Sequence, residues 1–275
     1  MKIGFITDLI DDAFVKDMAC TGINRYIKQL INALLRLDRK NQYTLIHHRK
    51  VEEDVYRKTK ELIVPICEVP FWHEIRKAIV LPLLVNKERF DVIHEPNAFS
   101  PYLFSPHLKK ILTIHDLSTF LYPFMHTRSN VLRSRISISA SLKKVNRIIA
   151  VSNYTKSEIM RIFHIPENII EVIYEGVDAR FRPVKECEKI RKKYGISARI
   201  ILFLGTLEPR KNISGLIKSF YKLKRKGIEH KLVVAGPEGW KCRELKEAVK
   251  QLGLLEDVAF LGYIHDDDLP ALYNA

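Results

Sequence analysis

Two adjacent cations, Arg210 and Lys211, lie between an apolar run that ends before Gly205 and an amphipathic run that begins after Asn212. Asparagine commonly caps helices, and the first turn of a helix has unpaired backbone N–H groups whose partial positive charge attracts anions. Cations at that end oppose the helix dipole by roughly 0.3–1 kcal/mol each, which a bound anion offsets. We therefore predict that residues 205–212 form a binding site for a diphosphate.

A second candidate phosphate contact follows the first apolar run. Residues 2–7 read as a strand, and the loop after it leads to Gly22 and Ile23 at the start of a helical pattern. Glycine lets a ligand approach the backbone, although a plain helix start explains the same residues. The chain has neither a G-x-G-x-x-G motif after this strand nor a Walker sequence, so a nicotinamide enzyme and a P-loop NTPase have no direct support.

Two histidine and acid pairs follow apolar strand patterns. Open parallel sheets bind ligands at the carboxyl ends of their strands, where we expect His115 and Asp116. Histidine can exchange a proton near neutral pH or donate a hydrogen bond to a sugar hydroxyl. His94 and Glu95 hold an equivalent position and are weaker candidates. A histidine bonded to local backbone is the alternative for both.

We expect no metal site. The acidic run at residues 265–268 precedes a helical pattern, where aspartates favour the helix start without binding an ion. His47 and His48 would point to opposite faces of one strand. The four cysteines form no C-x-x-C pair, so we expect them to be reduced and buried; they are Cys20, Cys67, Cys187 and Cys242.

The composition is that of a globular protein with two domains. The chain has 275 residues, of which 47% are hydrophobic and 28% are charged. It has no apolar run of the roughly 18–20 residues that a membrane span needs. The strand-like start with its early Asp8 is unlike a signal peptide, so we expect a cytoplasmic protein.

The net charge is +14, and the positive charge is densest between Arg180 and Lys231. Residues 180–231 contain 16 Lys and Arg against 4 Glu and no Asp, which gives +12 in this stretch. Such a zone attracts polyanions or an anionic membrane, although solvated helix faces explain it equally well. A nonspecific nucleic-acid binder stays an alternative, but no reading module is visible.

Strand and helix patterns alternate from end to end, which predicts parallel α/β domains. The first half predicts a helix over 22–37, a serine-rich helix over 129–141 with a solvated face, and a helix capped by Ser152 with a capping box of Thr155 and Glu158. Its expected strands are 2–7, 43–47, 90–94, 111–115, 147–151 and 169–174.

The pattern changes near residues 177–183, where a proline ends an aperiodic stretch, so we expect domains at 1–178 and 179–275. The second half predicts strands at 200–204, 231–235 and 258–261, and helices over 213–226, 242–252 and from 268. A doubly wound domain typically has about six strands. We therefore expect a second domain that is either small or incomplete.

Eight segments in one order resemble the group 1 family of retaining glycosyltransferases, which have the GT-B fold of two Rossmann-like domains facing a cleft. They are TGINRY (21–26), DVIH (91–94), TIHDL (113–117) with YP (122–123), RIIAVSNYT (147–155), GVD (176–178), GTLEPRKN (205–212), VVAG (233–236) and FLGY (260–263).

The resemblance implies that the N-terminal domain binds the acceptor, that the C-terminal domain binds a nucleotide sugar, and that no metal or other cofactor is needed. Arg210, Lys211 and Gly205 would hold the donor diphosphate, and the cations would stabilise its charge as it leaves. Gly22 and Ile23 would contact the same diphosphate, His115 with Asp116 would contact or orient the transferred sugar, and His94 and Glu95 would contact the acceptor.

Two departures from the family pattern stand out. Glu175 occupies a position where the family often has asparagine, which we interpret as a minor change in a linker. The family's pair of donor-site glutamates, eight positions apart, is expected beyond Ala275, which would make the second domain truncated. An inactive fragment or a scaffold therefore stays an alternative to an enzyme.

The TIHDL and YP segments resemble those of mannosyltransferase-type members that build lipopolysaccharide or other surface glycans. The resemblance favours GDP-mannose over UDP-glucose as the donor and a glycan or lipid-linked acceptor. The basic charge would then favour peripheral association with the anionic inner face of the cell membrane.

Overall fold

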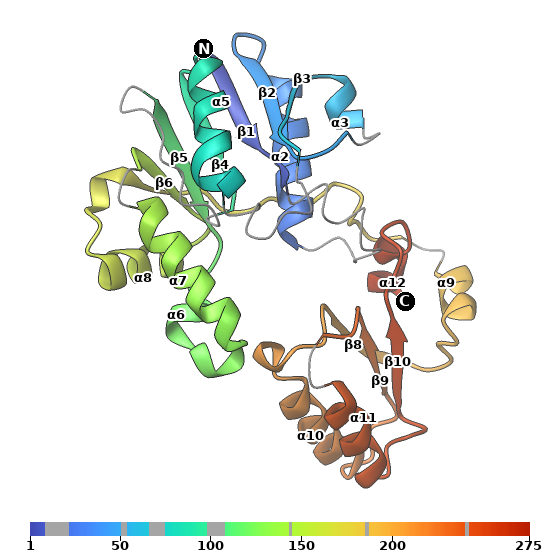
Figure 1. Ribbon diagram of the computed structural model, residues 1–275. Helices are drawn as coiled ribbons and strands as arrows, with labels where there is room; N and C mark the ends of the chain where they lie inside the picture. The colour runs from blue at the N-terminus through green and yellow to red at the C-terminus, as the bar shows by residue number, and fades with distance from the viewer. Residues whose placement is uncertain are drawn as a thin grey trace. The chain divides into compact units, whose positions relative to one another are not determined.

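The computed structural model divides the chain into two compact units, Met1–Glu175 and Gly176–Ala275, each of which is described by itself (Figure 1). The expected boundary between residues 178 and 179 lies close to this division. The structure describes residues 1–8, 22–50, 54–65, 75–97, 108–142, 145–184, 187–239 and 242–275. Thr21, Cys20 and Cys67 lie outside these ranges.

The first unit contains a parallel sheet in the order β3-β2-β1-β4-β5-β6-β7. The order reverses between β1 and β4, the position at which doubly wound sheets bind ligands beside the carboxyl ends of their strands. The strands are β1 Lys2–Ile6, β2 Gln42–His47, β3 Lys60–Ile63, β4 Val92–Glu95, β5 Lys109–Ile114, β6 Arg147–Ala150 and β7 Ile170–Val172.

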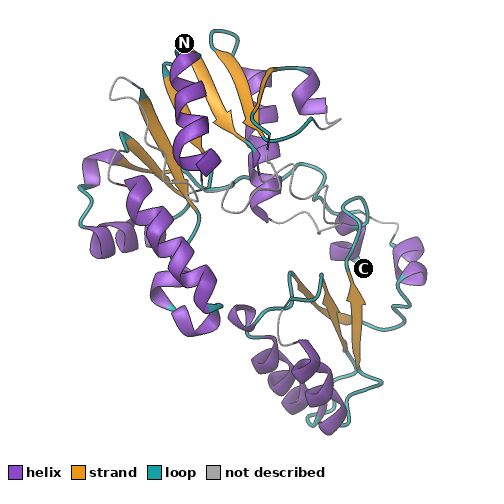
Figure 2. Ribbon diagram, in the orientation of Figure 1, coloured by secondary structure: helices purple, strands orange, loops and turns teal. Residues whose placement is uncertain are grey.

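Neighbouring residues of the central strands pack into different apolar clusters, because successive side chains of a strand point to opposite faces of the sheet. Phe5 and Leu45 pack with the helix α2, whereas Ile6 and Ile46 pack with the helix α5. Figure 2 shows helices on both sides of this sheet. They are α2 Gly22–Leu37, α3 Asp54–Arg57, the π-helix η1 Arg76–Val80, α5 Leu81–Lys87, α6 Ser118–Leu121, the 3-10 helix η2 Pro123–Met125, α7 Arg128–Leu142, α8 Asn153–Phe163 and the 3-10 helix η3 Glu167–Ile169.

Two local predictions in this unit need correction. The Ser152 hydroxyl caps α8 by accepting a hydrogen bond from the Thr155 backbone N–H at 3.0 Å, so Thr155 is inside the helix and does not begin a capping box with Glu158. The serine-rich helix α7 does not turn all its serines to solvent. Ser134, Ser137 and Ser141 are buried, while Leu132 is exposed.

The second unit has three parallel strands in the order β10-β9-β8, which match the three expected strands. They are β8 Ile200–Leu204, β9 Lys231–Ala235 and β10 Val258–Gly262. Apolar clusters cover both faces of this sheet, one including Ile217 and Phe220 and the other Ile190 and Leu269. The helices are α9 Glu188–Lys193, the 3-10 helix η4 Pro209–Lys211, α10 Ile213–Lys224, α11 Cys242–Gln251 and α12 Leu269–Asn274.

Within the described residues, we find no helix whose length and hydropathy would suit a membrane crossing.

Candidate functional site

The turn after β8 is fixed by hydrogen bonds to the loop after β9. The Gly205 N–H donates to the Ala235 carbonyl at 2.9 Å, and the Leu207 N–H donates to the Pro237 carbonyl at 2.9 Å. The Gly239 N–H returns a bond to the Leu207 carbonyl at 3.1 Å. These bonds join the turn after β8 to the loop after β9 and so fix the backbone that leads to the predicted diphosphate site.

Close backbone contact makes glycine necessary in this turn. Gly236 has a φ of 137°, and a Cβ atom added there would lie 2.0 Å from the Gly205 carbonyl oxygen. Gly205 itself has a φ of 150°, a conformation that residues with side chains rarely adopt. A side chain at position 236 would push the two strand ends apart.

Arg210 and Lys211 lie on the 3-10 turn η4, directly before the cap of α10. Asn212 adopts the left-handed conformation with φ of 52°, and its side-chain oxygen accepts a hydrogen bond from the Gly215 N–H at 3.2 Å. The cap is as expected from the sequence. The two cations precede the cap, as expected, and lie on a short 3-10 turn.

Glu208 orients the arginine of this pair, a contact that sequence reasoning missed. The Arg210 Nη2 donates to Glu208 Oε1 at 2.7 Å. The Glu208 side chain is 11% exposed and that of Arg210 is 33% exposed, so the acid is packed into the turn while the guanidinium reaches solvent. A carboxylate two residues before an arginine on a turn is the signal that could have indicated this pairing.

In the first unit, His115 follows β5 at the carboxyl end of the sheet, as the sequence predicts. Its Nδ1 lies 2.9 Å from Glu175 Oε1, and its Nε2 lies 3.0 Å from the carbonyl oxygen of Pro96, which follows β4. The ring edge meets Tyr26 of α2 with centroids 4.7 Å apart and planes at 86°. Three segments distant in sequence therefore fix this imidazole.

Asp116 has a local structural contact. Its Oδ1 accepts hydrogen bonds from the Ser118 backbone N–H at 2.9 Å and from the Ser118 hydroxyl at 2.7 Å, which orders the start of α6. The residue is exposed. Its predicted contact with the transferred sugar stays a prediction.

His94 and Glu95 lie inside β4 and are 5% and 1% exposed. The His94 Nε2 lies 2.8 Å from the Thr113 hydroxyl, and burial, together with a smaller effect of the nearby His115, lowers the pKa of His94 to about 3. Glu95 Oε2 lies 3.4 Å from the Nζ of the buried Lys110. These two side chains offer an acceptor very little surface, and their proposed acceptor contacts stay predictions.

Gly22 and Ile23 begin α2, as expected. The start of this helix is open, because a Cβ added at Gly22 would meet no described atom within 4 Å. The same helix carries Tyr26 one turn later, and the Tyr26 hydroxyl lies 3.4 Å from the Thr113 hydroxyl. Tyr26 therefore joins α2 to the cluster around His115.

A buried ion pair joins the ends of the first three strands and was not expected from the sequence. The guanidinium of Arg76, which is 0% exposed, binds both carboxylate oxygens of Asp8 at 2.8 and 2.9 Å. Its Nε donates to the Val64 carbonyl at 2.6 Å, and His48 Nδ1 lies 3.5 Å from Asp8. The pair links residues 68 positions apart, which no local pattern indicates.

The acidic run at 265–268 pairs with cations. Asp268 binds the Lys193 Nζ at 2.5 Å and the Tyr194 hydroxyl at 2.6 Å, while Asp266 and Asp267 lie 3.8 Å from Arg180. Where the structure describes the chain, His, Cys, Asp and Glu side chains form no group of three or more suited to a metal ion.

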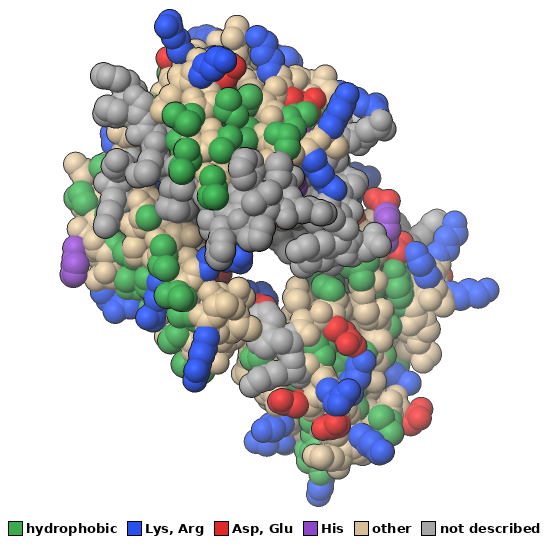
Figure 3. All heavy atoms as spheres, viewed as in Figure 1, with side chains coloured by type: hydrophobic (Ala, Val, Ile, Leu, Met, Phe, Trp, Pro, Cys, Tyr) green, Lys and Arg blue, Asp and Glu red, His purple; other side chains and the backbone are tan. Residues whose placement is uncertain are grey.

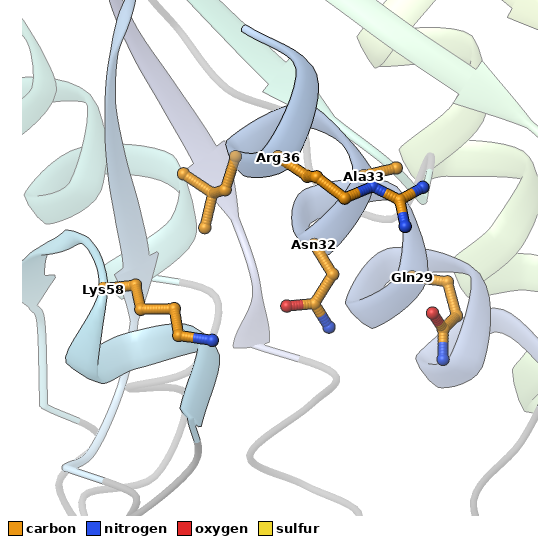
Figure 4. A pocket seen from close by; sticks show the side chains of 6 residues that line it. Gln29, Asn32, Ala33, Arg36 and Lys58 are labelled. Atoms are coloured by element: carbon orange, nitrogen blue, oxygen red, sulfur yellow. The ribbon is translucent and has the colours of Figure 1, made fainter. Parts of the chain in front are cut away.

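A polar hollow of about 380 Å³ lies between α2 and Lys58, which follows α3. Figure 4 shows Gln29, Asn32 and Arg36 of α2 around it. These residues lie between positions 29 and 36 of α2, whereas Tyr26, which contacts His115, lies earlier in the helix. The hollow is therefore separate from the candidate site.

Two protein-family models match the chain. Residues 21–181 match the model described as Glycosyltransferase Family 4, and residues 186–275 match the model described as Glycosyl transferases group 1. Together they cover both structural units.

Curated relatives match parts of the chain. The O-antigen chain mannosyltransferase B of Escherichia coli is 32% identical over 189 residues, which are 67% of this chain and 49% of the relative. The mannosylfructose-phosphate synthase of Agrobacterium fabrum is 33% identical over 143 residues, 48% of this chain and 32% of the relative. The chain spans about half or less of the length of these relatives.

The crystal structure of Anabaena Alr3699/HepE in complex with UDP and glucose has a similar fold. It matches 99% of this chain and 71% of its own, with a TM-score of 0.69 and 17% sequence identity. At this identity the likeness concerns the fold alone. It confirms the predicted class, a GT-B protein with two Rossmann-like α/β units.

Proposed function

This chain belongs to glycosyltransferase family 4, of the group 1 type, and from that premise we propose that it moves a sugar from a nucleotide diphosphate sugar to a glycan or lipid-linked acceptor. The N-terminal unit binds the acceptor, and the C-terminal unit binds the donor. The sugar keeps its anomeric configuration, and no metal ion takes part.

One observation carries this proposal: Arg210 and Lys211 lie between the carboxyl end of β8 and a helix capped by Asn212. A guanidinium has five N–H donors, so one bond to Glu208 can orient Arg210 while its other donors bind phosphate oxygens. The hydrogen bonds of the turn hold this geometry before a ligand arrives. Such preorganisation is what makes electrostatic stabilisation of a leaving group effective.

The two cations supply the positive charge that a metal ion supplies elsewhere, because negative charge grows on the diphosphate as its bond to the sugar breaks. Gly22 and Ile23 offer the N–H groups of the first turn of α2 to the same diphosphate. His115, beside Asp116, contacts the transferred sugar or orients it. His94 and Glu95 stay weaker candidates for the acceptor, since both are buried.

We favour GDP-mannose over UDP-glucose as the donor. The TIHDL and YP segments support this choice, and so do the names of the two relatives, which both concern mannosyl transfer or a mannosyl product. Calorimetric titration of the purified protein with GDP-mannose, UDP-glucose and the matching nucleoside diphosphates tests it. Tighter binding of GDP-mannose is expected, tighter binding of UDP-glucose would reverse the donor assignment, and binding of none of these ligands would contradict a donor site.

We also propose peripheral association with an anionic membrane surface through α7 and η2. Phe124, Leu132 and Ile136 are 76%, 62% and 58% exposed, and Arg128 and Arg135 are exposed beside them. Hydrophobic and basic side chains lie over this part of the molecule in Figure 3. The helix α7 buries Ile138 and Leu142 along with three serines, but it leaves Leu132 and Ile136 exposed, and exposed apolar side chains beside arginines suit a lipid surface.

A further inference from the structure

Glu175, the last residue of the first unit, contacts the ring of His115 across 60 positions of sequence. The carboxylate oxygen lies 2.9 Å from Nδ1, and the side chains of His115 and Glu175 are 14% and 48% exposed. The interpretation of Glu175 as a minor linker change is therefore wrong, because its side chain is part of the candidate site.

The two partners of the His115 ring are both acceptors. A carboxylate and a backbone carbonyl accept hydrogen bonds and donate none, whereas a neutral imidazole has a single N–H. Two contacts at 2.9 and 3.0 Å therefore require that both ring nitrogens carry protons. The alternative is a neutral ring beside a protonated Glu175. The ring spectrum described below distinguishes these two arrangements.

Among the described residues, the groups that pack around the ring are mostly uncharged. Tyr26 of α2 meets its edge, and burial raises the pKa of Tyr26, which keeps the phenol neutral. The buried His94 of β4 is held neutral. From α8, the Thr155 hydroxyl donates to the His115 carbonyl at 3.4 Å. Asp116, next in sequence, bonds Ser118. Glu175 is thus the carboxylate that binds the ring itself.

We propose that Glu175 is a positioning residue that holds His115 as a doubly protonated ring in one orientation. This inference rests on the proposed function, in which His115 contacts the transferred sugar. The Pro96 carbonyl fixes the Nε2 side of the ring, and no side-chain substitution removes it. The half-exposed Glu175 binds the Nδ1 side, so a side-chain substitution can release this edge of the ring alone.

The test compares Glu175→Ala and Glu175→Gln in the purified protein. We expect Glu175→Ala to lower kcat by about 10- to 100-fold, because misplacing a group by about 1 Å can reduce the rate by about that factor, with a smaller change in the KM for the donor. Glu175→Gln restores an acceptor oxygen at the same chain length and should recover part of the rate. Combining Glu175→Ala with His115→Ala should add nothing to the loss from His115→Ala alone.

Nitrogen-15 NMR of the His115 ring gives a readout that a merely structural role would not change. Both ring nitrogens should carry protons in the native protein at neutral pH, and one should lose its proton in Glu175→Ala. Glu167→Gln is the matched control, because Glu167 forms a comparable exposed ion pair with Lys156 at 2.8 Å on the same unit. It should alter neither the ring nor the rate.

The outcomes separate this inference from the proposed function. If His115→Ala and the paired Arg210→Ala and Lys211→Ala variant lose sugar transfer while Glu175→Ala keeps its full rate and an unchanged ring spectrum, the inference is overturned and the function stands. If those variants all transfer sugar at the native rate, the proposed function fails. The ring spectrum would then still show whether Glu175 keeps a proton on Nδ1 of His115.

Discussion

His94 shows how burial changes the chemistry of a residue type. Its ring packs against Phe5, with centroids 4.7 Å apart, and bonds the Thr113 hydroxyl. Desolvation disfavours the charged form, so burial lowers the pKa of His94 to about 3. This histidine is neutral at physiological pH and belongs to the core of the first unit.

The pH dependence of stability follows from this pKa. The unfolded chain binds a proton at His94 near pH 6.5 and the folded chain only near pH 3, so stability contributed by neutral His94 is present above pH 6.5 and is lost as the pH falls toward 3. The slope is roughly 1 kcal/mol per pH unit in this window. Denaturant unfolding at several pH values should show a shallower slope in His94→Gln. His164→Asn, at an exposed left-handed position, should keep the native slope; equal slopes in all three proteins would contradict the assignment.

The sequence predicted those parts of the site that depend on residues close together in the chain. Arg210, Lys211 and the Asn212 cap were found at the expected place because strand, turn and helix are adjacent in the chain. The partners of His115 and Arg76 were missed because they lie 60 and 68 positions away. His94 was expected at a strand end, but β4 extends through Glu95 and pairs with β5, which encloses it.

Elements with a continuous apolar run were predicted well, and short polar ones were not. The strands 200–204 and 231–235 have the expected bounds, and α2 matches residue for residue. The edge strand β3 was missed because its sequence, KELI, carries two charges and is largely exposed. The helices α3, α5 and α9 were missed too. Two of them, α3 and α9, have six residues or fewer and show little periodicity.

A substitution at Gly236 tests whether the turn after β8 depends on the close approach of Gly236 to the Gly205 backbone. Gly236→Ala should destabilise the second unit and weaken donor binding at least tenfold, because the new Cβ would lie 2.0 Å from the Gly205 carbonyl oxygen. Gly227→Ala is the control for backbone strain alone, since Gly227 also has a positive φ, 87°, but a Cβ there meets no described atom within 4 Å. It should cost about 1–2 kcal/mol and leave binding unchanged. Equal effects on binding would refute the close-contact explanation.

If α7 docks on a lipid surface, its exposed Leu132 and Ile136 should contribute to lipid binding. Leu132→Ser with Ile136→Ser should reduce co-sedimentation with vesicles containing phosphatidylglycerol by about tenfold or more, since each buried aliphatic side chain contributes roughly 1.5–3 kcal/mol. The same change at Ile79 of η1 and Leu83 of α5, which are 53% and 65% exposed, is the matched control. Higher salt should weaken native binding. Binding that is lost equally in both pairs, or that ignores lipid charge, would count against α7 as the docking face.

At the scale of the whole molecule, two units divide the proposed work. The first places His115, Tyr26 and Glu175 at the carboxyl end of a seven-stranded sheet. The second holds Arg210 and Lys211 after the first of its three strands. Residues 180–231 contain 16 Lys and Arg against 4 Glu, which gives +12, so the positive charge is densest in the stretch that contains the proposed donor cations.

The central claim is that Arg210 and Lys211 bind the donor diphosphate and stabilise it as it leaves. The most direct measurement is the rate of sugar transfer from GDP-mannose by a variant with Arg210→Ala and Lys211→Ala. Its control carries Lys218→Ala and Lys222→Ala, which remove the same charge from exposed positions of α10. The site variant should lose at least about 1,000-fold in kcat/KM with an unchanged unfolding midpoint, since one preorganised donor alone contributes about 100- to 1,000-fold. A native rate in that variant, or an equal loss in the control, would contradict the account.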